Sequence, residues 1–341
     1  MHQLKTGILL VNLGTPNSPK VPDVRRYLRE FLMDKRVIDI SQLGRWMLVN
    51  LIIAPFRAPK SAKVYKELWQ DRGSPLMFHG LDVVEKLKKK LNAEQYVIEL
   101  GMRYQKPSIK NALEVLKGHY VDRIIVIPLF PQYASATSGS VHEKVMEVIS
   151  DWQIIPEIKF ISQFYEHPKF IEAFAENAKK YMANKDYDHF VFSYHGLPER
   201  QIYKASVGDY CQLSENCCSA ITNKNAYCYR AQCFETSRLL AENLQIPREK
   251  YTICFQSRLG KDPWIQPYAD DIIPKLAGEG KKKVLAFSPA FVADCLETTI
   301  EVGEEFKEEF IKAGGIEWQL VESLNSNDMW IDCLHTIIAE N

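Results

Sequence analysis

The sequence predicts an α/β protein built from two Rossmann-like, doubly wound domains, each with a parallel sheet covered by helices. Short apolar runs rich in β-branched residues alternate with longer segments of helical periodicity, a pattern typical of parallel sheets covered on both faces. A length of 341 residues suits roughly two domains of about 150 residues. The strand candidates are 6–13, 96–102, 123–129, 189–194, 251–256, 283–287 and 317–321, and clear helical patterns cover 81–91, 109–118, 169–182, 233–244 and 296–313.

The order of these segments suggests where the domains begin and end. We expect a first domain over 1–160 and a second over 161–322, facing each other across a central cleft. The closing segment 323–341 is expected to pack back on the first domain. A cysteine-rich insert, 209–233, interrupts the second domain.

Composition excludes several classes of function. Acidic and basic residues balance at 43 each, so the formal net charge is zero, which argues against nucleic acid as a partner. No signal-peptide pattern or apolar run of about 18 residues is present, so we expect a cytoplasmic protein. The apolar stretch 46–56 is interpreted as a peripheral membrane contact, with a buried amphipathic helix as the alternative.

Unusual polar residues follow six of the predicted strands. Since ligands bind outside the carboxyl ends of the strands in such sheets, these residues are expected to line one site. They are Asn12 to Thr15, Arg103 and Tyr104, Pro131 to Tyr133, His195, Gln256 to Arg258, and Ser288 to Glu297.

Two of these residues are the best candidates for catalysis or metal binding. An apolar strand delivers His195 before Gly196 and Pro198 turn the chain, and an imidazole there is suited to act as a general base or metal ligand. Glu297 lies near a helix start, where a carboxylate suits a hard divalent cation. The plainer alternatives are a histidine satisfied by local hydrogen bonds and a solvated acidic helix face.

Five of the eight cysteines fall within 23 residues, at Cys211, Cys217, Cys218, Cys228 and Cys233. Disulfides are not expected in a cytosolic chain, so this density indicates metal chemistry. Thiolates with few neighbouring carboxylates favour an iron–sulfur cluster or structural zinc. Cys254 and Cys333 lie on apolar patterns and are expected in the core.

Eight motifs in order along the chain resemble the ferrochelatase family. They are Val11–Pro16, Phe31–Val37, Gly73–Leu76, Met102–Tyr104, Pro128–Tyr133, Ser193–Arg200, Phe255–Arg258 and the segment from Pro289 to Thr298. The resemblance implies a chelatase-like fold and an enzyme, a lyase of haem biosynthesis that inserts Fe²⁺ as its substrate into a porphyrin. It also implies that His195 and Glu297 are the catalytic and metal-binding pair.

Further residues follow from the resemblance alone. It implies porphyrin contacts at Leu13, Arg57, Tyr65, Ser74, Arg103, Tyr104 and Tyr133. Cys295 stands where animal relatives carry a histidine, which leaves more of the metal site to His195 and Glu297. Some ferrochelatases hold a [2Fe–2S] cluster, and we assign its ligands here to Cys211, Cys217, Cys218 and Cys228, with Cys233 as the competing fifth thiol. Structural zinc, or no cofactor, is the alternative.

Three rival functions remain open at this point. They are a chelatase for another divalent metal, a non-catalytic porphyrin or haem carrier, and an iron–sulfur redox protein. A carrier needs no base facing a carboxylate, and no GxGxxG fingerprint follows the first strand. The sequence leaves open whether the substrate is protoporphyrin or coproporphyrin, and whether the protein forms a homodimer.

Overall fold

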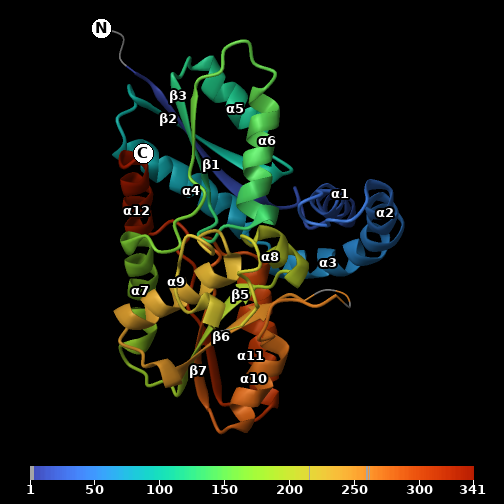
Figure 1. Cartoon of the computed structure of the whole chain (residues 1–341), viewed down its shortest axis with the longest axis vertical. Helices are drawn as coiled ribbons and strands as arrows, with labels where there is room; N and C mark the ends of the chain where they lie inside the picture. The colour runs from blue at the N-terminus through green and yellow to red at the C-terminus, as the bar shows by residue number, and fades with distance from the viewer. Residues whose placement is uncertain (1–3, 215, 259, 261) are drawn as a thin grey trace. The chain divides into compact units, whose positions relative to one another are not determined.

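The computed structural model describes residues 4–214, 216–258, 260 and 262–341. The chain divides into two compact units, each containing one sheet (Figure 1). The first unit comprises Met1–Phe130, Ser135–Gln163 and Ile331–Asn341, and the second comprises Pro131–Ala134 and Phe164–Trp330. The return of the chain to the first unit therefore begins at Ile331, eight residues later than the boundary that we expected from the sequence.

The first unit contains a four-stranded parallel sheet in the order β2-β1-β3-β4. Its strands are β1 (Thr6–Gly14), β2 (Tyr96–Tyr104), β3 (Arg123–Pro128) and β4 (Glu157–Phe160). Its helices are α1 (Val21–Leu32), α2 (Gln42–Met47), η1 (Leu48–Ile53), α3 (Ala54–Leu68), α4 (Pro75–Lys90), α5 (Ile109–Gly118), η2 (Ser135–Gly139) and α6 (Ser140–Ile149). Helix α12 (Asp328–Ala339) begins in the second unit and ends in the first.

Side-chain alternation along the strands explains why helices cover both faces of this sheet. Leu9 and Val11 of β1 pack into a fully buried cluster with α5 and α6. On the other face, Gly80 lets α4 approach Leu100 of β2, because a Cβ at Gly80 would meet the Leu100 side chain at 3.0 Å. The fully apolar β1 is thus buried from both sides, as the sequence predicted.

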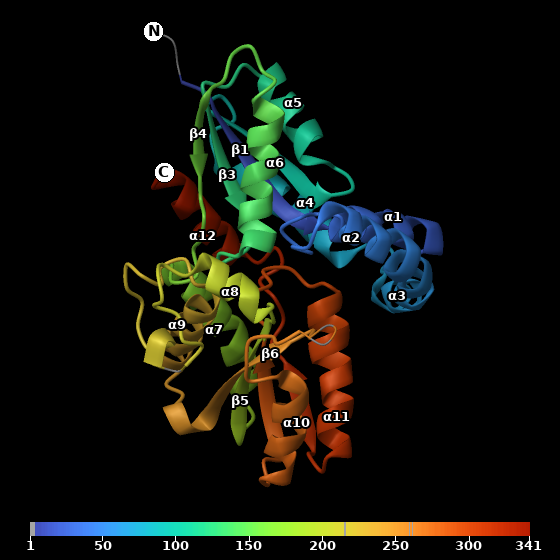
Figure 2. The ribbon, with the colours of Figure 1, turned by 45° about the vertical axis from the view of Figure 1, so that its right-hand side comes forward.

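Helices α1, α2 and α3 lie to one side of this sheet (Figure 2). Val24 of α1 packs against Ala58 and Ala62 of α3, which joins the helices into one arm of the first unit. Between α2 and α3 the chain forms η1, a π-helix whose wider turn is rare in proteins.

The second unit repeats the same topology with the order β6-β5-β7-β8. Its strands are β5 (His189–His195), β6 (Tyr251–Gln256), β7 (Lys283–Phe287) and β8 (Glu317–Leu320). Its helices are α7 (Pro168–Met182), α8 (Glu199–Ala205), η3 (Asn216–Cys218), α9 (Tyr229–Asn243), η4 (Arg248–Lys250), α10 (Ala269–Gly278), η5 (Glu297–Glu305) and α11 (Phe306–Lys312). Helices α10 and α11 bury one face of the sheet, with Phe310 fully buried among them.

This strand order locates the place in each sheet where a ligand is expected. The connection after β1 runs to β2 on one side, and that after β3 runs to β4 on the other; β5 and β7 of the second unit behave in the same way. A ligand is therefore expected at the carboxyl ends of β1 and β3, and of β5 and β7. In the second unit, β5 ends at His195, and the loop after β7 leads to Glu297. The fold class predicted from the sequence is confirmed. Strand β4, which the prediction omitted, completes the first sheet.

Candidate functional site

His195 is the last residue of β5 and pairs in register with Gln256, the last residue of β6. The turn after His195 depends on Gly196, because a Cβ there would approach the Gln256 carbonyl oxygen to 2.9 Å. The two strand ends therefore come close enough to place an imidazole beside a carboxamide. Gln256 is buried, whereas His195 is half-buried and accessible.

Local contacts fix the orientation of the His195 ring. Its Nδ1 lies 2.7 Å from the carbonyl oxygen of Gly196. Since a carbonyl can only accept, Nδ1 carries the hydrogen of this bond, and the lone pair of the neutral ring is on Nε2. The Tyr229 hydroxyl donates to the His195 carbonyl over 2.9 Å, and the Trp264 ring lies 6.5 Å away between centroids.

The loop after β7 carries the chain to η5, which is a π-helix over its whole length, Glu297–Glu305. A π-helix has i→i+5 hydrogen bonds and more than four residues per turn, so Glu297 and Glu301 lie on nearly the same face. Such helices are uncommon and often occur at functional sites. Glu304 and Glu305, at the end of η5, are exposed to solvent.

Glu301 is held by two hydrogen bonds from the end of β6. Gln256 Nε2 donates to Glu301 Oε2 over 2.9 Å, and Ser257 Oγ donates to the same oxygen over 2.6 Å. Gln256 is oriented in turn by Ser193 Oγ, which donates to its Oε1 over 2.6 Å, and Gln256 Nε2 also reaches the Glu297 carbonyl oxygen at 3.3 Å. Ser257 adopts a left-handed φ of 65°, which is uncommon for a residue other than glycine.

The electrostatics of Glu301 link the residues of this group. Burial raises the pKa of the Glu301 carboxyl above its usual range, and the neighbouring Glu297 carboxylate raises it further. The hydrogen bond from Ser257 and the His195 imidazole act in the opposite direction. Gln256, the register partner of His195, contacts both Glu301 and the Glu297 carbonyl, so these residues lie in one region of the second unit. A base with a free Nε2 beside two carboxylates can accept protons and attract a divalent cation.

From the sequence we named His195 and Glu297 and placed Gln256 among the residues lining the site, but we did not name Glu301 or Ser193. Glu301 was visible only as one member of an acidic row, and helical spacing does not separate a buried glutamate from exposed ones. Ser193 lies in an apolar run and is fully buried. The useful signal was the cluster of polar residues after β6, which includes Gln256 and Ser257.

The proposed porphyrin contacts of the first unit lie in different surroundings. Leu13 is partly exposed near the end of β1, and Arg57 is exposed on α3. Tyr65 is half-buried, and its ring meets that of Tyr27 edge to face at 6.3 Å. Ser74 precedes α4 and is buried, and its hydroxyl accepts a hydrogen bond from Thr15 Oγ1 over 2.9 Å.

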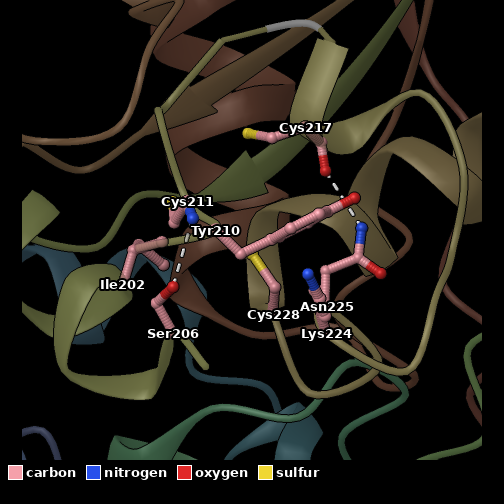
Figure 3. Close-up of a pocket in the computed structure, with 8 residues that line it drawn as sticks. All are labelled: Ile202, Ser206, Tyr210, Cys211, Cys217, Lys224, Asn225 and Cys228. Atoms are coloured by element: carbon pink, nitrogen blue, oxygen red, sulfur yellow. Dashed lines mark hydrogen bonds between the residues drawn. The ribbon is translucent and has the colours of Figure 1, made fainter. Parts of the chain in front are cut away.

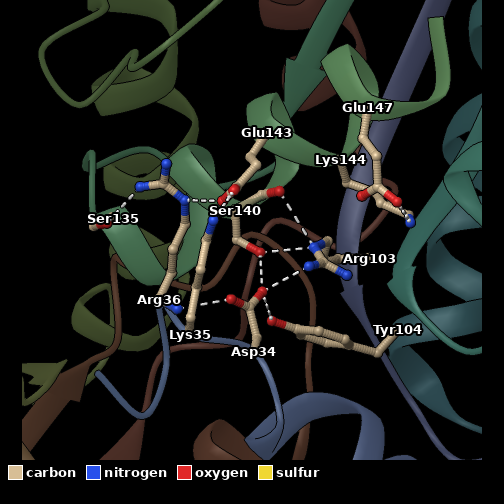
Figure 4. A network of polar contacts seen from close by, with 10 residues as sticks. All are labelled: Asp34, Lys35, Arg36, Arg103, Tyr104, Ser135, Ser140, Glu143, Lys144 and Glu147. Carbon is tan, nitrogen blue, oxygen red and sulfur yellow. Dashed lines mark hydrogen bonds and ion pairs between the residues drawn. The ribbon is translucent and has the colours of Figure 1, made fainter. Parts of the chain in front are cut away.

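Arg103 and Tyr104 belong to a buried polar network around Asp34 (Figure 4). Arg103 Nη2 lies 2.6 Å from Asp34 Oδ2, and the Tyr104 hydroxyl donates to the same oxygen over 2.9 Å. Ser140 at the start of α6 also contacts Asp34 and Arg103. Tyr104 is fully buried, and its hydroxyl completes this network. Its assignment as a porphyrin contact stays a prediction.

Tyr133, the remaining proposed contact, belongs to the second unit. Its ring meets Tyr227 of the cysteine-rich insert edge to face, with centroids 5.2 Å apart. Its backbone N–H donates to Gln232 Oε1 of α9 over 2.6 Å. The insert is therefore packed against a predicted site residue.

Four of the five clustered cysteines lie together, and the fifth does not. The Sγ atoms of Cys217 and Cys218 are 3.9 Å apart. Cys211, Cys217 and Cys228 line a cavity of about 10 Å³, with Tyr210 lying across it (Figure 3). Cys233 is fully buried on α9, and burial raises the pKa of its thiol well above the usual value. The assignment of Cys211, Cys217, Cys218 and Cys228 to a cluster stays a prediction.

Charge and hydrogen bonding favour a thiolate at Cys228, whereas burial raises the pKa of the Cys211 thiol. The Cys218 thiol donates to Cys228, which lowers the pKa of Cys228 to about 6. Arg230, itself buried, directs Nη1 to Cys218 Sγ over 3.1 Å. This donor set suits a thiolate-bound cation or cluster. Within the described part of the chain, however, no three or more His, Cys, Asp or Glu side chains are arranged to hold one metal ion.

The stretch 46–56 is buried at Val49 and Ala54 and exposes several large apolar side chains. Its most exposed side chains are Phe56, at 77%, and Leu51 and Ile52, at 57% and 56%. Leu43 of α2 extends the same surface. None of the helices within the described residues has the length and apolar character needed to cross a membrane.

Solved structures first define the class of protein. SirB from Bacillus subtilis with Fe³⁺ matches with a TM-score of 0.56 and 13% identity, covering 99% of this chain and 95% of that chain. The sirohydrochlorin chelatase SirB from Bacillus subtilis subspecies spizizenii, in complex with cobalt, matches with a TM-score of 0.53 and 10% identity over the same shares. At these identities the likeness shows the fold, which is that of metal chelatases.

Sequence comparison then identifies the family. A ferrochelatase family model matches residues 5–341. A ferrochelatase of Legionella pneumophila (strain Paris) is 46% identical over 337 residues, covering 99% of both chains. One of Coxiella burnetii (strain Dugway 5J108-111) is 42% identical over 334 residues, covering 97% of this chain and 92% of the relative. This chain belongs to the ferrochelatase family, as its motifs predicted.

Proposed function

We propose that this ferrochelatase inserts Fe²⁺ into its porphyrin with His195 as the proton acceptor and Glu297, assisted by Glu301, as the carboxylate that receives the metal. The observation that supports this proposal is the position of Gln256, which pairs in register with His195 and whose amide contacts both the Glu301 carboxylate and the Glu297 carbonyl. Family membership supplies the overall reaction, iron insertion into a porphyrin during haem synthesis. The residue roles are our assignment.

The chemistry requires two events at the same nitrogen atoms. Two pyrrole N–H protons must leave the ring, and the nitrogen lone pairs must then bind the metal. Because Nδ1 of His195 donates to the Gly196 carbonyl, the lone pair that can accept a proton is on Nε2. Nε2 accepts the two pyrrole protons in turn and passes each of them to solvent. The carboxylates of Glu297 and Glu301 offer the hard oxygen ligands that a divalent cation accepts in transit. Overall, one Fe²⁺ enters and two protons are released.

The test is an anaerobic metallation assay with Fe²⁺, comparing wild type with His195→Ala. We expect the rate to fall by about 100-fold or more, the usual contribution of a general base, while porphyrin binding measured by fluorescence is retained. His119→Ala, at an exposed position on the first unit, is the matched control. Full activity of His195→Ala would remove the imidazole from the mechanism. Porphyrin binding without metallation by wild type would favour a carrier, and preference for Co²⁺ or Ni²⁺ would favour another chelatase.

The same assay compares protoporphyrin and coproporphyrin, which differ in their number of propionates. A propionate pairs best with a guanidinium, and Arg57 is exposed on α3. We propose that Leu13, Arg57, Tyr65, Ser74, Arg103, Tyr104 and Tyr133 contact the macrocycle or support those residues that do. An Arg57→Met variant with a raised KM for one porphyrin only would identify the propionate that Arg57 binds.

We also propose that Cys211, Cys217, Cys218 and Cys228 hold a [2Fe–2S] cluster. Support comes from their proximity, from the lowered pKa of Cys228 and from the cationic Arg230 beside Cys218. A bound cluster would supply a redox-active, thiolate-ligated centre, and the four thiols would require some rearrangement to surround it. Structural zinc is the second candidate for the same donors.

The exposed apolar surface of 43–56 supports a further proposal, peripheral contact with a lipid bilayer. Exposed Leu, Ile and Phe side chains on one arm suit insertion at the interfacial depth of a membrane. Arg57 and Lys60 follow on α3 and can meet anionic headgroups. The substrate, an apolar macrocycle, partitions into the same phase.

A further inference from the structure

Asp294 and Asn325 form a reciprocal pair of hydrogen bonds in the second unit. The backbone N–H of Asp294 donates to Asn325 Oδ1 over 2.9 Å. In return, Asn325 Nδ2 donates to Asp294 Oδ2 over 2.7 Å. Asn325 also donates its backbone N–H to the Val292 carbonyl over 2.7 Å, and its φ of 51° is left-handed. Asparagine tolerates this conformation better than most residues do.

The other oxygen of Asp294 reaches the start of the π-helix. Asp294 Oδ1 accepts a hydrogen bond from the Ser323 N–H at 3.2 Å and lies 3.4 Å from Thr298 Oγ1. Thr298, in the first turn of η5, is almost fully buried and accepts the Cys295 N–H over 3.0 Å. One carboxylate therefore joins the segment after β8 to the first turn of η5.

The segment after β8 is itself firmly held. Asn177 of α7, which is buried, donates to the carbonyl oxygens of Glu322 and Ser323 at 3.3 and 3.2 Å. The Val321 N–H donates to the Ala286 carbonyl of β7 over 2.8 Å. Asn325 is therefore presented to Asp294 from a fixed position beside the sheet.

A π-helix needs such external support, because its hydrogen-bond geometry makes it rare as a free-standing element. Glu297 and Glu301 both belong to η5, and Glu297 follows Asp294 by three residues. We propose that the Asp294–Asn325 pair positions η5, so that it sets where the Glu297 and Glu301 carboxylates lie relative to His195. This inference rests on the proposed function of those three residues.

Asp294 is a positioning residue in this account. Two N–H donors already occupy its carboxylate, Ser323 N–H on one oxygen and Asn325 Nδ2 on the other. The Thr298 hydroxyl lies 3.4 Å from the first oxygen, and its closer acceptor is the Cys295 carbonyl at 3.1 Å. A carboxylate with both oxygens committed to donors is a poor ligand for a passing cation. Its negative charge is therefore dispensable, provided that the hydrogen bonds are kept.

The test exchanges the two side chains. In Asp294→Asn alone, the new amide N–H₂ at 294 faces the Asn325 N–H₂, so the hydrogen bond from Asn325 Nδ2 is lost. In Asn325→Asp alone, the new carboxylate at 325 faces the Asp294 carboxylate, and the two repel each other. In the double variant, the new amide at 294 donates to the new carboxylate at 325, and the remaining oxygen at 294 still accepts from Ser323. We expect each single variant to lower kcat for Fe²⁺ insertion by about tenfold or more and the double variant to return to within about threefold of wild type.

A second readout does not depend on activity. Hydrogen exchange followed by mass spectrometry reports the opening of η5 in the peptide covering residues 297–306. Both single variants are expected to accelerate exchange in this peptide, and the double variant to restore protection. Asn325→Gly, which keeps the left-handed backbone and removes only the side chain, serves if a charged single variant does not fold.

Asp188→Asn is the matched control. Its carboxylate accepts the N–H groups of Lys282 and Lys283, both at 2.8 Å, at the start of β7 and far from its carboxyl end. This change is expected to reduce stability and leave both kcat and exchange in 297–306 unaltered. A double variant as inactive as Asp294→Asn, but with restored protection, would assign chemistry to the Asp294 carboxylate itself. Unchanged hydrogen exchange in the single variants would refute the proposal that the Asp294–Asn325 pair positions η5, whatever the metallation assay shows for His195.

Discussion

The Gln256 carboxamide donates a hydrogen bond of 2.9 Å to the Glu301 carboxylate, and so connects the end of β6 to the π-helix η5. Gln256 is the register partner of His195 on β5, so a single buried side chain bridges the backbone position of the base and the carboxylate. The orientation of this amide is set by Ser193, whose hydroxyl donates to Oε1. The predictions below begin with this bridge.

Gln256→Met keeps the volume of the side chain and removes its hydrogen bonds. We expect kcat to fall by about tenfold or more, because Glu301 loses a donor that orients it. The Ser193 hydroxyl is left without its acceptor, so the free energy of unfolding measured in urea should be about 1–3 kcal/mol lower than in wild type. Steady-state kinetics and urea titration measure the two effects, with the exposed Gln153→Met as control. Normal kcat with reduced stability would make Gln256 purely structural.

Glu301→Gln tests the buried carboxyl. Burial raises its pKa, so the folded state holds this proton to higher pH than the unfolded chain does. Ionisation of this buried carboxyl therefore lowers the free energy of unfolding as the pH rises from the pKa of the unfolded chain through the higher pKa of the folded state. We expect the variant to be at least as stable as wild type at pH 7, and this advantage to shrink as the pH is lowered towards 4.

The same variant should lose most of its metallation activity, because an amide cannot receive Fe²⁺ as a carboxylate does. Urea midpoints at several pH values and the anaerobic assay measure these effects. Glu305→Gln, exposed on the same helix, is the control and should behave as wild type. An active Glu301→Gln enzyme would limit the metal site to His195 and Glu297.

Asp34→Leu tests the buried network of the first unit. Arg103, Tyr104 and Ser140 all contact this carboxylate, and Ser140, Arg36 and Arg103 lower its pKa against the opposing effect of burial. Removing it leaves a mostly buried guanidinium unpaired, which typically costs about 3–5 kcal/mol. Thermal unfolding measures the loss. Asp82→Leu, which removes a more exposed partner of Arg72, should cost about 1 kcal/mol or less.

Serine variants of the cysteines test the cluster. Cys211→Ser, Cys217→Ser, Cys218→Ser and Cys228→Ser should each abolish visible absorption and iron in anaerobically purified protein. Cys233→Ser should keep both, because this thiol is buried on α9, apart from the other four. Zinc content without visible absorption would establish structural zinc. Wild-type protein lacking both metals would show that the thiols are free.

Leu51→Glu combined with Phe56→Glu tests the exposed surface of the arm. Both side chains are more than half exposed, so the substitutions should leave thermal stability unchanged. Inserting each into a bilayer would contribute about 1.5–3 kcal/mol, so the double variant should bind vesicles at least 100-fold more weakly. Co-sedimentation with phosphatidylcholine and phosphatidylglycerol vesicles measures this, with Tyr120→Glu as control. Equal binding by both proteins would exclude this surface as the membrane contact.

Much of this structure could be predicted from the sequence, and the exceptions have physical causes. Strands β1, β5 and β7 are continuous apolar runs, so periodicity located them well. Strand β4 is an edge strand of four residues with two exposed side chains, which leaves little hydrophobic signal. The burial of Tyr104 depends on Asp34, 70 residues earlier in the chain, and no local pattern reveals such a pairing.

At the site, the sequence indicated which strand ends carry polar groups but not how these groups pair. The turn at Gly196 and the strand before it made His195 conspicuous. The bond between Gln256 and Glu301 joins positions 45 residues apart, and η5 follows the same periodicity in sequence as an ordinary helix would. The π-helical winding that brings Glu301 to the site became visible only in three dimensions.

That winding has a consequence for how the chain tolerates insertions and deletions. A π-helical turn accommodates an extra residue relative to an α-helix without disturbing what lies on either side. Deleting one residue between Glu297 and Phe306 would therefore be absorbed by a change towards α-helical winding, and Phe306 and Phe310 would keep their hydrophobic neighbours. What would change is the spacing between Glu297 and Glu301, and with it the contact of Glu301 with Gln256. The length of this segment is therefore constrained by the two carboxylates and not by the hydrophobic packing that follows them.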